Sequence, residues 1–257
     1  MIPKIIHYCW FGGKELPPNL KEFMKSWDIL KENGYQIIRW DESNCSFDEN
    51  EFVKKAYKEK KWGFIGDYYR LKAVYEYGGI YLDTDVIINK PFDDLLDNKA
   101  FIGFMHNYAI CTAIFGAEKH SKFIKNLLDM YDKGLYDSRD SVLFNKEPID
   151  EYKDGFKLPS NEYWTWNIIK NYHLKPGIEQ HYDEVAIYPK TYFEGGSLTG
   201  NYYCRHINTG SWIDPSSVSL LLRFIRFLKR NEKIWILFAH RKQRLLEKSA
   251  KEYFNFK

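Results

Sequence analysis

The chain has 257 residues, of which 44% are hydrophobic and 18% aromatic, enough to bury the core of one large globular domain. Its four cysteines are scattered without a C-x-x-C pair, and no apolar run reaches about 18 residues, so we expect a cytoplasmic protein with reduced thiols and no spanning helix. The net charge is +3, and residues 217–257 carry +8, so the first 216 residues carry −5. An acidic body of this kind argues against a nucleic-acid-binding protein.

The first part of the chain alternates between extended and helical patterns. Residues 2–10 and 35–40 are rich in β-forming side chains, and a helical pattern follows each of them, at 19–31 and 51–60. A further helix and strand continue the alternation. This order predicts an α/β fold with a doubly wound, mostly parallel sheet.

A helix is predicted over residues 64–77, because apolar side chains recur there at helical spacing. The apolar stripe places Tyr69 and Glu76 on the opposite side, which we expect to face water. Asp67 and Arg70 are three residues apart and flank the stripe, so they share a helix face. They form either an intrahelical salt bridge or part of a polar site.

The extended run over residues 80–88 is interrupted only by Asp83 and Asp85. Side chains two residues apart on a strand point to the same face, so we expect these carboxylates to lie together. Mg²⁺ and Mn²⁺ take such oxygens and share them with substrate phosphates, whereas a solvated turn is the alternative interpretation. The end of an apolar strand favours the metal site, because ligands bind at the carboxyl ends of strands in open α/β sheets.

The pattern D-x-x-R on a helix, followed by G-G-x-Y-x-D-x-D, resembles the sugar-nucleotide site of glycosyltransferase family 32. This family includes yeast mannosyltransferases and bacterial capsule enzymes, and large clostridial glucosylating toxins share its core. The resemblance extends along most of residues 2–212. It implies a GT-A type fold over residues 1–215 and a retaining, Mn²⁺- or Mg²⁺-dependent transferase of a hexose or N-acetylhexosamine, with UDP-sugar donors favoured.

Residue roles are implied by the same resemblance. Asp67 and Arg70 are expected to hold the donor sugar and phosphates, Asp85 to bind the metal, and Asp83 to contact the ribose or the metal. Family members open with a similar I-P-K-x-I-H-x-x-W segment whose tryptophan stacks on the nucleotide base. Trp10 is the candidate for that role, and core packing is its alternative.

The second half of the chain contains two more extended runs, at residues 100–105 and 109–115, and a helix that ends near Tyr131. Residues 138–155 are polar and resist assignment to an element. Residues 160–172 look helical, and an extended run at 185–193 precedes the last motif.

That last motif spans residues 202–212 and resembles a family segment, H-x-x-x-x-S-W, that folds over the diphosphate. In this reading His206 completes the metal shell, with Asn208 as its rival, since Mn²⁺ accepts nitrogen more readily than Mg²⁺ does. Ser211 and Trp212 donate hydrogen bonds to phosphate oxygens.

Residues 216–257 differ in charge from the rest of the chain. From residue 217 onward, eleven Lys and Arg stand against three Glu, and they interleave with apolar residues over 218–248. A basic amphipathic helical segment of this kind suits an anionic membrane surface, and packing on the domain or a partner helix is the alternative. Membrane attachment predicts a peripheral protein on the inner face of the cell membrane, acting on a glycan or lipid-linked oligosaccharide in capsule or exopolysaccharide synthesis.

Two other functions are compatible with parts of the sequence. The segment L-D-T-D-V resembles the nucleophile motif of haloacid-dehalogenase-like phosphatases, with Asp83 as the residue that would be phosphorylated. That motif normally lies on the first strand, whereas here two strands precede it. The second possibility is a non-catalytic membrane-surface protein whose sugar-nucleotide site has decayed.

Overall fold

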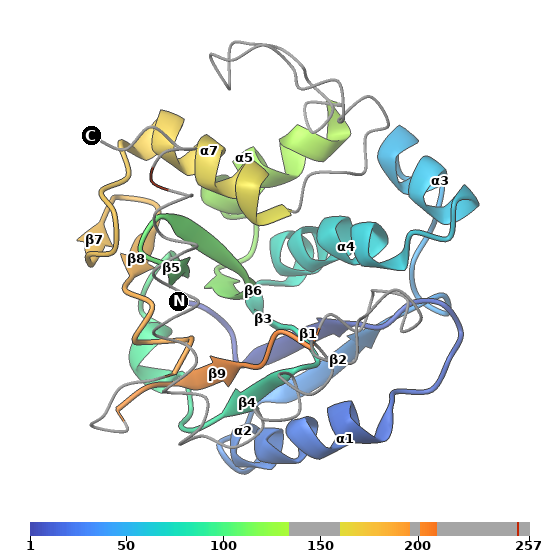
Figure 1. The fold of residues 1–257 in the computed structure, drawn as a ribbon, viewed down its shortest axis with the longest axis horizontal. Coiled ribbons are helices and arrows are strands. Elements are labelled where there is room, and N and C mark those ends of the chain that lie inside the picture. Colours follow the sequence, from blue (N-terminus) through green and yellow to red (C-terminus); the bar gives the residue numbers. More distant parts are fainter. Residues whose placement is uncertain (134–159, 196–200, 210–250, 252–257) are drawn as a thin grey trace.

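The computed structural model describes residues 1–133, 160–195, 201–209 and 251, and Figure 1 shows their arrangement. At the centre lies a seven-stranded sheet with the order β2-β1-β3-β6-β5-β8-β7. Its strands are β1 (Ile5–Cys9), β2 (Gln36–Trp40), β3 (Gly79–Leu82), β5 (Ala100–His106), β6 (Ala109–Ala117), β7 (Gln180–His181) and β8 (Ala186–Tyr188). Five of the seven run in one direction, and β6 and β7 run against them. The predicted α/β fold with a mostly parallel sheet is therefore confirmed.

Helices cover both faces of the sheet, as a doubly wound fold requires. Those on one face, shown in the upper part of Figure 1, are α3 (Glu51–Lys58), α4 (Trp62–Tyr77), α5 (Lys122–Asp132) and α7 (Ser160–Tyr172). On the other face lie α1 (Pro18–Met24), the 3-10 turn η1 (Lys25–Trp27) and α2 (Asp28–Glu32), with a second 3-10 turn, η2 (Asp93–Leu95), near them in the apolar core. The single helix predicted over residues 19–31 is thus three short segments, because buried Trp27 anchors its middle and donates its indole N–H to the Val86 carbonyl.

The acidic motif does not lie on a strand, so the prediction of one strand over residues 80–88 is wrong. The chain leaves the central sheet after β3, turns at Asp83–Asp85, and enters β4 (Val86–Ile88). This strand pairs antiparallel with β9 (Cys204–His206) in a separate two-stranded sheet, with Val86 opposite His206. Aspartates favour turns over strand interiors, and the turn lets the chain change sheets between them.

Helix α4 is buried more completely than its sequence pattern predicts. Tyr69, expected to face water, is only 2% exposed, because its ring packs against Phe11 and its hydroxyl donates to the Ser46 carbonyl. Glu76 is exposed, as predicted. The error arose because the segment that follows β2 covers a face that helical spacing alone assigns to solvent.

The start of β3 depends on a glycine and a buried histidine. Gly79 has φ +108°, and a Cβ there would come within 2.5 Å of the Ile5 carbonyl oxygen, so glycine lets β3 approach β1. His7 accepts a hydrogen bond from Trp40 on Nδ1, so its Nε2–H donates to the Gly78 carbonyl at 2.8 Å. Burial lowers the pKa of His7 to about 4, which keeps it neutral in this structural role.

Several predictions fall outside the described residues. These are the basic segment 216–257 apart from residue 251, the polar stretch 138–155, and the two phosphate donors Ser211 and Trp212. Within the part of the chain that is described, no helix combines the length and apolar character needed to cross a membrane. The domain boundary at residue 215 therefore stays a prediction.

Candidate functional site

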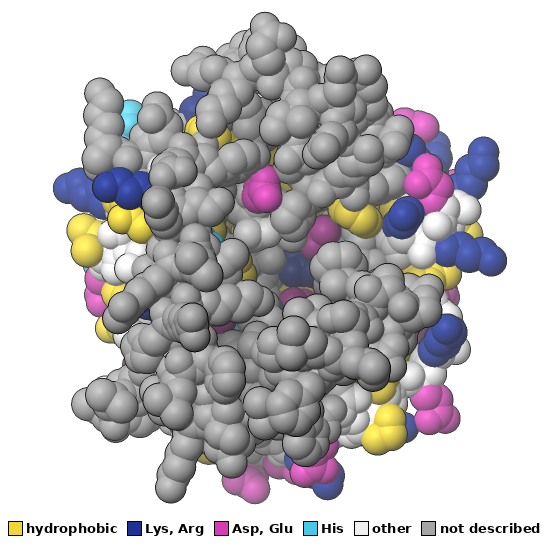
Figure 2. Space-filling view, in the orientation of Figure 1, with side chains coloured by type: hydrophobic (Ala, Val, Ile, Leu, Met, Phe, Trp, Pro, Cys, Tyr) yellow, Lys and Arg dark blue, Asp and Glu magenta, His cyan; other side chains and the backbone are white. Residues whose placement is uncertain are grey.

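Two stretches that are far apart in the sequence meet where β3 ends. The turn between β3 and β4 brings Asp83 and Asp85, and β9 brings His206. One ligand atom of each of these three side chains lies within 4.8 Å of the other two. Figure 2 shows acidic and basic side chains together at a hollow near the centre of this face of the molecule. The predicted convergence of the acidic motif and the late histidine is thus present in the fold.

Arg70 organises the α4 side of the site. Its Nη2 lies 3.0 Å from Asp67 Oδ1 and 3.6 Å from Asp83 Oδ1. Nη1 donates to the Thr112 carbonyl at 2.9 Å, and Nε donates to the Gly66 carbonyl at 3.2 Å. The arginine is 8% exposed, so the protein itself satisfies this buried cation on three of its nitrogens.

Burial acts differently on the two ionised groups of this pair. It raises the pKa of Asp67 to about 6, even though the Arg70 charge opposes that rise. Burial also tends to lower the pKa of Arg70, but the charge of Asp83 and other nearby groups outweighs it and raises that pKa. Arg70 therefore stays charged at every physiological pH.

Tyr81 is the tyrosine of the motif G-G-x-Y-x-D-x-D, but the sequence reasoning gave it no role in the site. Its hydroxyl donates to Asp83 Oδ1 at 2.8 Å, and the Arg70 guanidinium lies 4.9 Å from the centre of its ring. Its position two residues before Asp83 was the available signal, because alternate residues along an extended chain share a face. Asp83 is thus held by an aromatic hydroxyl and a guanidinium.

Asp85 has a different set of partners. Its Oδ1 lies 3.2 Å from His206 Nε2, and its Oδ2 accepts hydrogen bonds from Thr209 N at 2.7 Å and Thr209 Oγ1 at 2.9 Å. Burial would raise the pKa of Asp85, but the His206 charge and the Thr209 donors outweigh burial and lower it to about 2. The sequence reasoning did not single out Thr209. This residue follows Asn208 in the late motif, and no pattern in the sequence marks it as a site residue.

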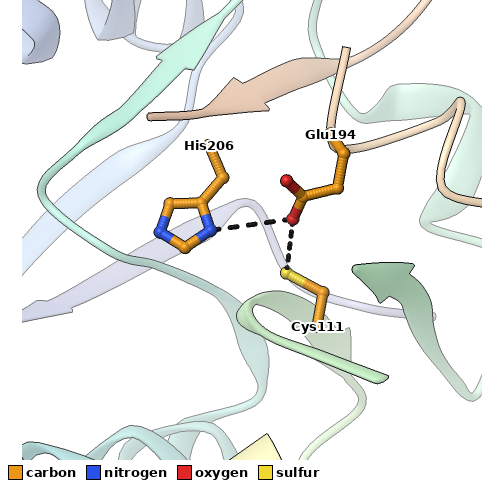
Figure 3. Close-up of side chains that lie close together, drawn as sticks. All are labelled: Cys111, Glu194 and His206. Atoms are coloured by element: carbon orange, nitrogen blue, oxygen red, sulfur yellow. Dashed lines mark hydrogen bonds and ion pairs between the residues drawn. The ribbon is translucent and has the colours of Figure 1, made fainter. Parts of the chain in front are cut away.

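His206 lies between the carboxylates of Asp85 and Glu194. Figure 3 shows the Glu194 side of its ring. Its Nδ1 is 3.6 Å from Glu194 Oε1. The same oxygen accepts a hydrogen bond from the Cys111 thiol at 3.1 Å. Burial lowers the pKa of His206, but the Asp85 charge and hydrogen bonds outweigh it and raise that pKa well above the usual value. Burial likewise raises the pKa of Cys111 to about 12, so its sulfur keeps a proton and donates.

Two other predicted residues occupy the edges of this region. Trp10 is half-buried, donates its indole N–H to the Lys14 carbonyl at 2.6 Å, and packs against a small cluster that includes Leu20 and Ile207. Asn208 has φ +57° and turns its side-chain amide toward the His206 carbonyl at 3.4 Å. The base-stacking role of Trp10 and the metal role of Asn208 stay predictions.

The donor set fits a divalent cation in its chemistry. Asp83 and Asp85 supply the carboxylate oxygens that Mg²⁺ and Mn²⁺ prefer, and His206 supplies an imidazole nitrogen that suits Mn²⁺. All three lie beside the carboxyl end of β3, and ligands bind at the carboxyl ends of strands in open α/β sheets.

Comparisons with known proteins agree with this geometry. Residues 17–102 match the family model described as "Glycosyltransferase sugar-binding region containing DXD motif". Inositol phosphoceramide mannosyltransferase 1 of Schizosaccharomyces pombe is 25% identical over 93% of this chain and 69% of its own length. An uncharacterized glycosyltransferase of Acanthamoeba polyphaga mimivirus is 27% identical over 74% of this chain and 67% of its own length.

A solved structure titled "PaToxG Glycosyltransferase" aligns with a TM-score of 0.47 and 20% identity over 67% of this chain and 70% of its own. The matched family region contains α4, the acidic turn and β4, which are the elements that build the α4 side of the site. The match to this family model favours a glycosyltransferase over the phosphatase alternative. Residues 17–102 therefore carry the DXD-containing sugar-binding region of glycosyltransferases, as the resemblance to family 32 implied, and the two relatives that match more of the chain are glycosyltransferases by name.

Proposed function

We propose that this glycosyltransferase moves a hexose or N-acetylhexosamine from a sugar nucleotide, with UDP-linked donors favoured, to a glycan or lipid-linked oligosaccharide. The observation that carries the proposal is the convergence of Asp83, Asp85 and His206 within 4.8 Å at the end of β3. In the reaction, the bond from the anomeric carbon to the diphosphate breaks and a bond to an acceptor hydroxyl oxygen forms. The hydroxyl proton passes to the departing diphosphate.

In this proposal, Asp85 and His206 hold a divalent cation, Mn²⁺ or Mg²⁺, and Asp83 contacts either the cation or the ribose. The position of Asp85 supports a metal-ligand role, because its Oδ1 lies 3.2 Å from His206 Nε2 and both atoms can therefore reach the same cation. When bound, the cation supplies positive charge to the departing diphosphate.

Asp67 and Arg70 have a refined role. Because Arg70 already serves Asp67, Asp83 and two backbone carbonyls, little of its hydrogen-bonding capacity is left for donor phosphates. We therefore place Arg70 as the group that fixes both aspartates and adds positive potential to the site, and Asp67 as the acceptor for donor sugar hydroxyls.

The remaining donor contacts rest on the resemblance to family 32. Trp10 would stack on the nucleotide base, and its half-buried position near Ile207 leaves it partly accessible beside β9. Ser211 and Trp212 would donate to the diphosphate, and both lie two to three residues beyond Thr209, which binds Asp85 directly.

The name of the Schizosaccharomyces pombe relative refers to mannosyl transfer and to inositol phosphoceramide. Mannose from a GDP-linked donor is therefore a second donor worth testing beside UDP-sugars, and a lipid-borne acceptor is consistent with both. The net charge of +8 on residues 217–257 supports a peripheral position on an anionic inner membrane face, in capsule or exopolysaccharide synthesis.

A thermal-shift screen of UDP- and GDP-sugars, with and without Mn²⁺, tests the proposal. A cognate donor should raise the Tm of the wild-type protein only when Mn²⁺ is present, because only the metal-bearing site holds the diphosphate. Asp28→Asn, on the exposed surface of α2, should behave as wild type, whereas Asp85→Asn should show no donor-dependent shift.

Three results would contradict the proposal. One is a donor shift of equal size without metal, and another is an Asp85→Asn shift equal to that of the wild type. The third is release of phosphate from a simple phosphomonoester with Asp83 as nucleophile. Loss of all UDP binding, with liposome binding intact and no transfer to any acceptor, would instead favour the non-catalytic alternative.

A further inference from the structure

Glu194 is a buried acidic residue that the proposed reaction does not use directly. It is 4% exposed and lies in the turn after β8, where its backbone N–H donates to the Lys190 carbonyl at 2.9 Å. Gly195 follows with φ +67°, and a Cβ there would crowd the Arg205 stem at about 3.1 Å. The turn that carries Glu194 therefore packs closely against β9, the strand that carries His206.

The Glu194 carboxylate has a small and specific set of neighbours. Its Oε1 accepts a hydrogen bond from the Cys111 thiol at 3.1 Å and lies 3.6 Å from His206 Nδ1. Figure 3 shows these three side chains together. Among the described residues, His206 is the one group within ion-pair distance that can carry positive charge. A buried carboxylate needs such a partner, because burial without one is costly.

The two nitrogens of the His206 ring face different groups. Nε2 points to Asp85 at 3.2 Å, on the side of the acidic turn, whereas Nδ1 points to Glu194. An ionised carboxylate can only accept, so the Nδ1 that faces it carries a hydrogen. That arrangement leaves the Nε2 lone pair for a ligand beside Asp83 and Asp85. The present 3.6 Å is longer than a typical hydrogen bond by about 0.6 Å, so the two groups must move closer for this hydrogen bond to form.

We propose that Glu194 is a positioning residue: it orients His206 with Nδ1–H toward the interior and Nε2 toward the acidic turn, and Cys111 holds Glu194 in place. The inference rests on the proposed cation site at Asp83, Asp85 and His206. Metal-binding histidines commonly donate their other ring N–H to a carboxylate, and losing that partner weakens metal binding about 10- to 100-fold.

The variants that test this role are Glu194→Met, which has similar size and cannot hydrogen-bond, and Glu194→Gln, whose amide oxygen can still accept from Nδ1–H. Glu179→Met is the matched control, because Glu179 pairs with the exposed His181 at 2.8 Å on the protein surface. Each full-length variant is first checked for cooperative unfolding, and Glu194→Gln serves if Glu194→Met does not fold.

The first measurement is Mn²⁺ affinity in the presence of UDP, from the electron paramagnetic resonance signal of free Mn²⁺. Glu194→Met should bind Mn²⁺ about 10- to 100-fold more weakly than wild type, Glu194→Gln should lie between the two, and Glu179→Met should match wild type. If wild type binds Mn²⁺ with neither UDP nor GDP, the proposed function fails and the inference fails with it. If wild type binds and Glu194→Met binds equally well, the inference alone is overturned.

The second measurement is nitrogen NMR of the His206 ring with UDP and Zn²⁺, which is diamagnetic and binds imidazole. The wild-type spectrum should show Nε2 bound to metal and Nδ1 protonated, and Glu194→Met should lose this defined state. A spectrum in which Nδ1 binds the metal would overturn the positioning role. It would assign Cys111, Glu194 and His206 to a second metal site, since their ligand atoms also lie within 4.8 Å of one another.

Discussion

The two aspartates of the acidic turn are only two residues apart, yet different parts of the chain hold them. Asp83 is held by Tyr81, two residues before it, and by Arg70 from the preceding helix. Asp85 is held by His206 and Thr209, which come more than 120 residues later. The first half of the site is therefore built by local sequence, and the second half depends on the pairing of β4 with β9.

The difference also appears in the acid–base chemistry of the two sides. Burial dominates on the α4 side and raises the pKa of Asp67 to about 6, whereas direct donors dominate on the β9 side and lower the pKa of Asp85 to about 2. Similar burial thus has opposite outcomes, because Thr209 and His206 donate to the charged form of Asp85.

Removing the positive charge of Arg70, on the α4 side, should have the largest effect on stability. Arg70→Met leaves Asp67 and Asp83 without their buried partner, so we expect the free energy of unfolding to fall by about 3–5 kcal/mol. Chemical denaturation measures the change. The exposed ion pair of Lys54 with Glu51 supplies the control, and Lys54→Met should change stability by less than about 0.5 kcal/mol. Equal effects for the two variants would show that Arg70 is not a buried organiser.

Removing the charge on the β9 side should act mainly on catalysis. Asp85→Asn keeps the size of the side chain but removes the anionic ligand, and we expect kcat/KM for sugar transfer to fall by about 10²–10³. Steady-state kinetics at saturating Mn²⁺ tests this. A loss below about fivefold would mean that Asp85 does not take part in charge stabilisation.

The opposite pKa shifts predict opposite pH dependences of stability in metal-free protein. Asp85 has a pKa of about 2 in the folded state against an ordinary 3.8, so its stabilisation of about 2 kcal/mol is present above pH 3.8 and is lost as pH falls toward 2. Asp67 has a raised pKa of about 6, so it opposes folding by up to about 3 kcal/mol as pH rises from 3.8 to 6.

Urea unfolding of wild type, Asp85→Asn and Asp67→Asn with a chelator present measures these slopes. Relative to wild type, Asp85→Asn should gain stability as pH falls below about 4, and Asp67→Asn should gain it as pH rises from about 4 to 6. Parallel curves for the two variants would contradict the contrast between the two sides.

The smallest effects are expected from single hydrogen bonds to the aspartates. Tyr81→Phe removes one donor to Asp83, and Thr209→Val removes one of the two Thr209 donors to Asp85. Each should lower the free energy of unfolding by about 1.5 kcal/mol, the lower end of the range for bonds to charged groups. Denaturation of the two single variants and the double variant checks the value. Strong coupling in the double variant would show that the two sides are not independent.

The sequence was informative where the site is local and uninformative where it depends on tertiary pairing. The helix with Asp67 and Arg70, its glycine stop and the acidic pair all follow from spacing and turn chemistry. The break between β3 and β4 did not, because an apolar run of nine residues with two aspartates reads as one strand. Glu194, Cys111 and Thr209 carry no local signal, since only the β4–β9 pairing and the turn after β8 bring them to His206.

The central claim is that Asp83, Asp85 and His206 serve one cation that holds the donor diphosphate. Nitrogen hyperfine coupling on Mn²⁺ bound in the presence of UDP tests it most directly. We predict coupling from one imidazole in the wild-type protein and its loss in His206→Asn, while the exposed His181→Asn leaves it intact. Bound Mn²⁺ that shows no nitrogen coupling, or coupling that survives in His206→Asn, would contradict the claim.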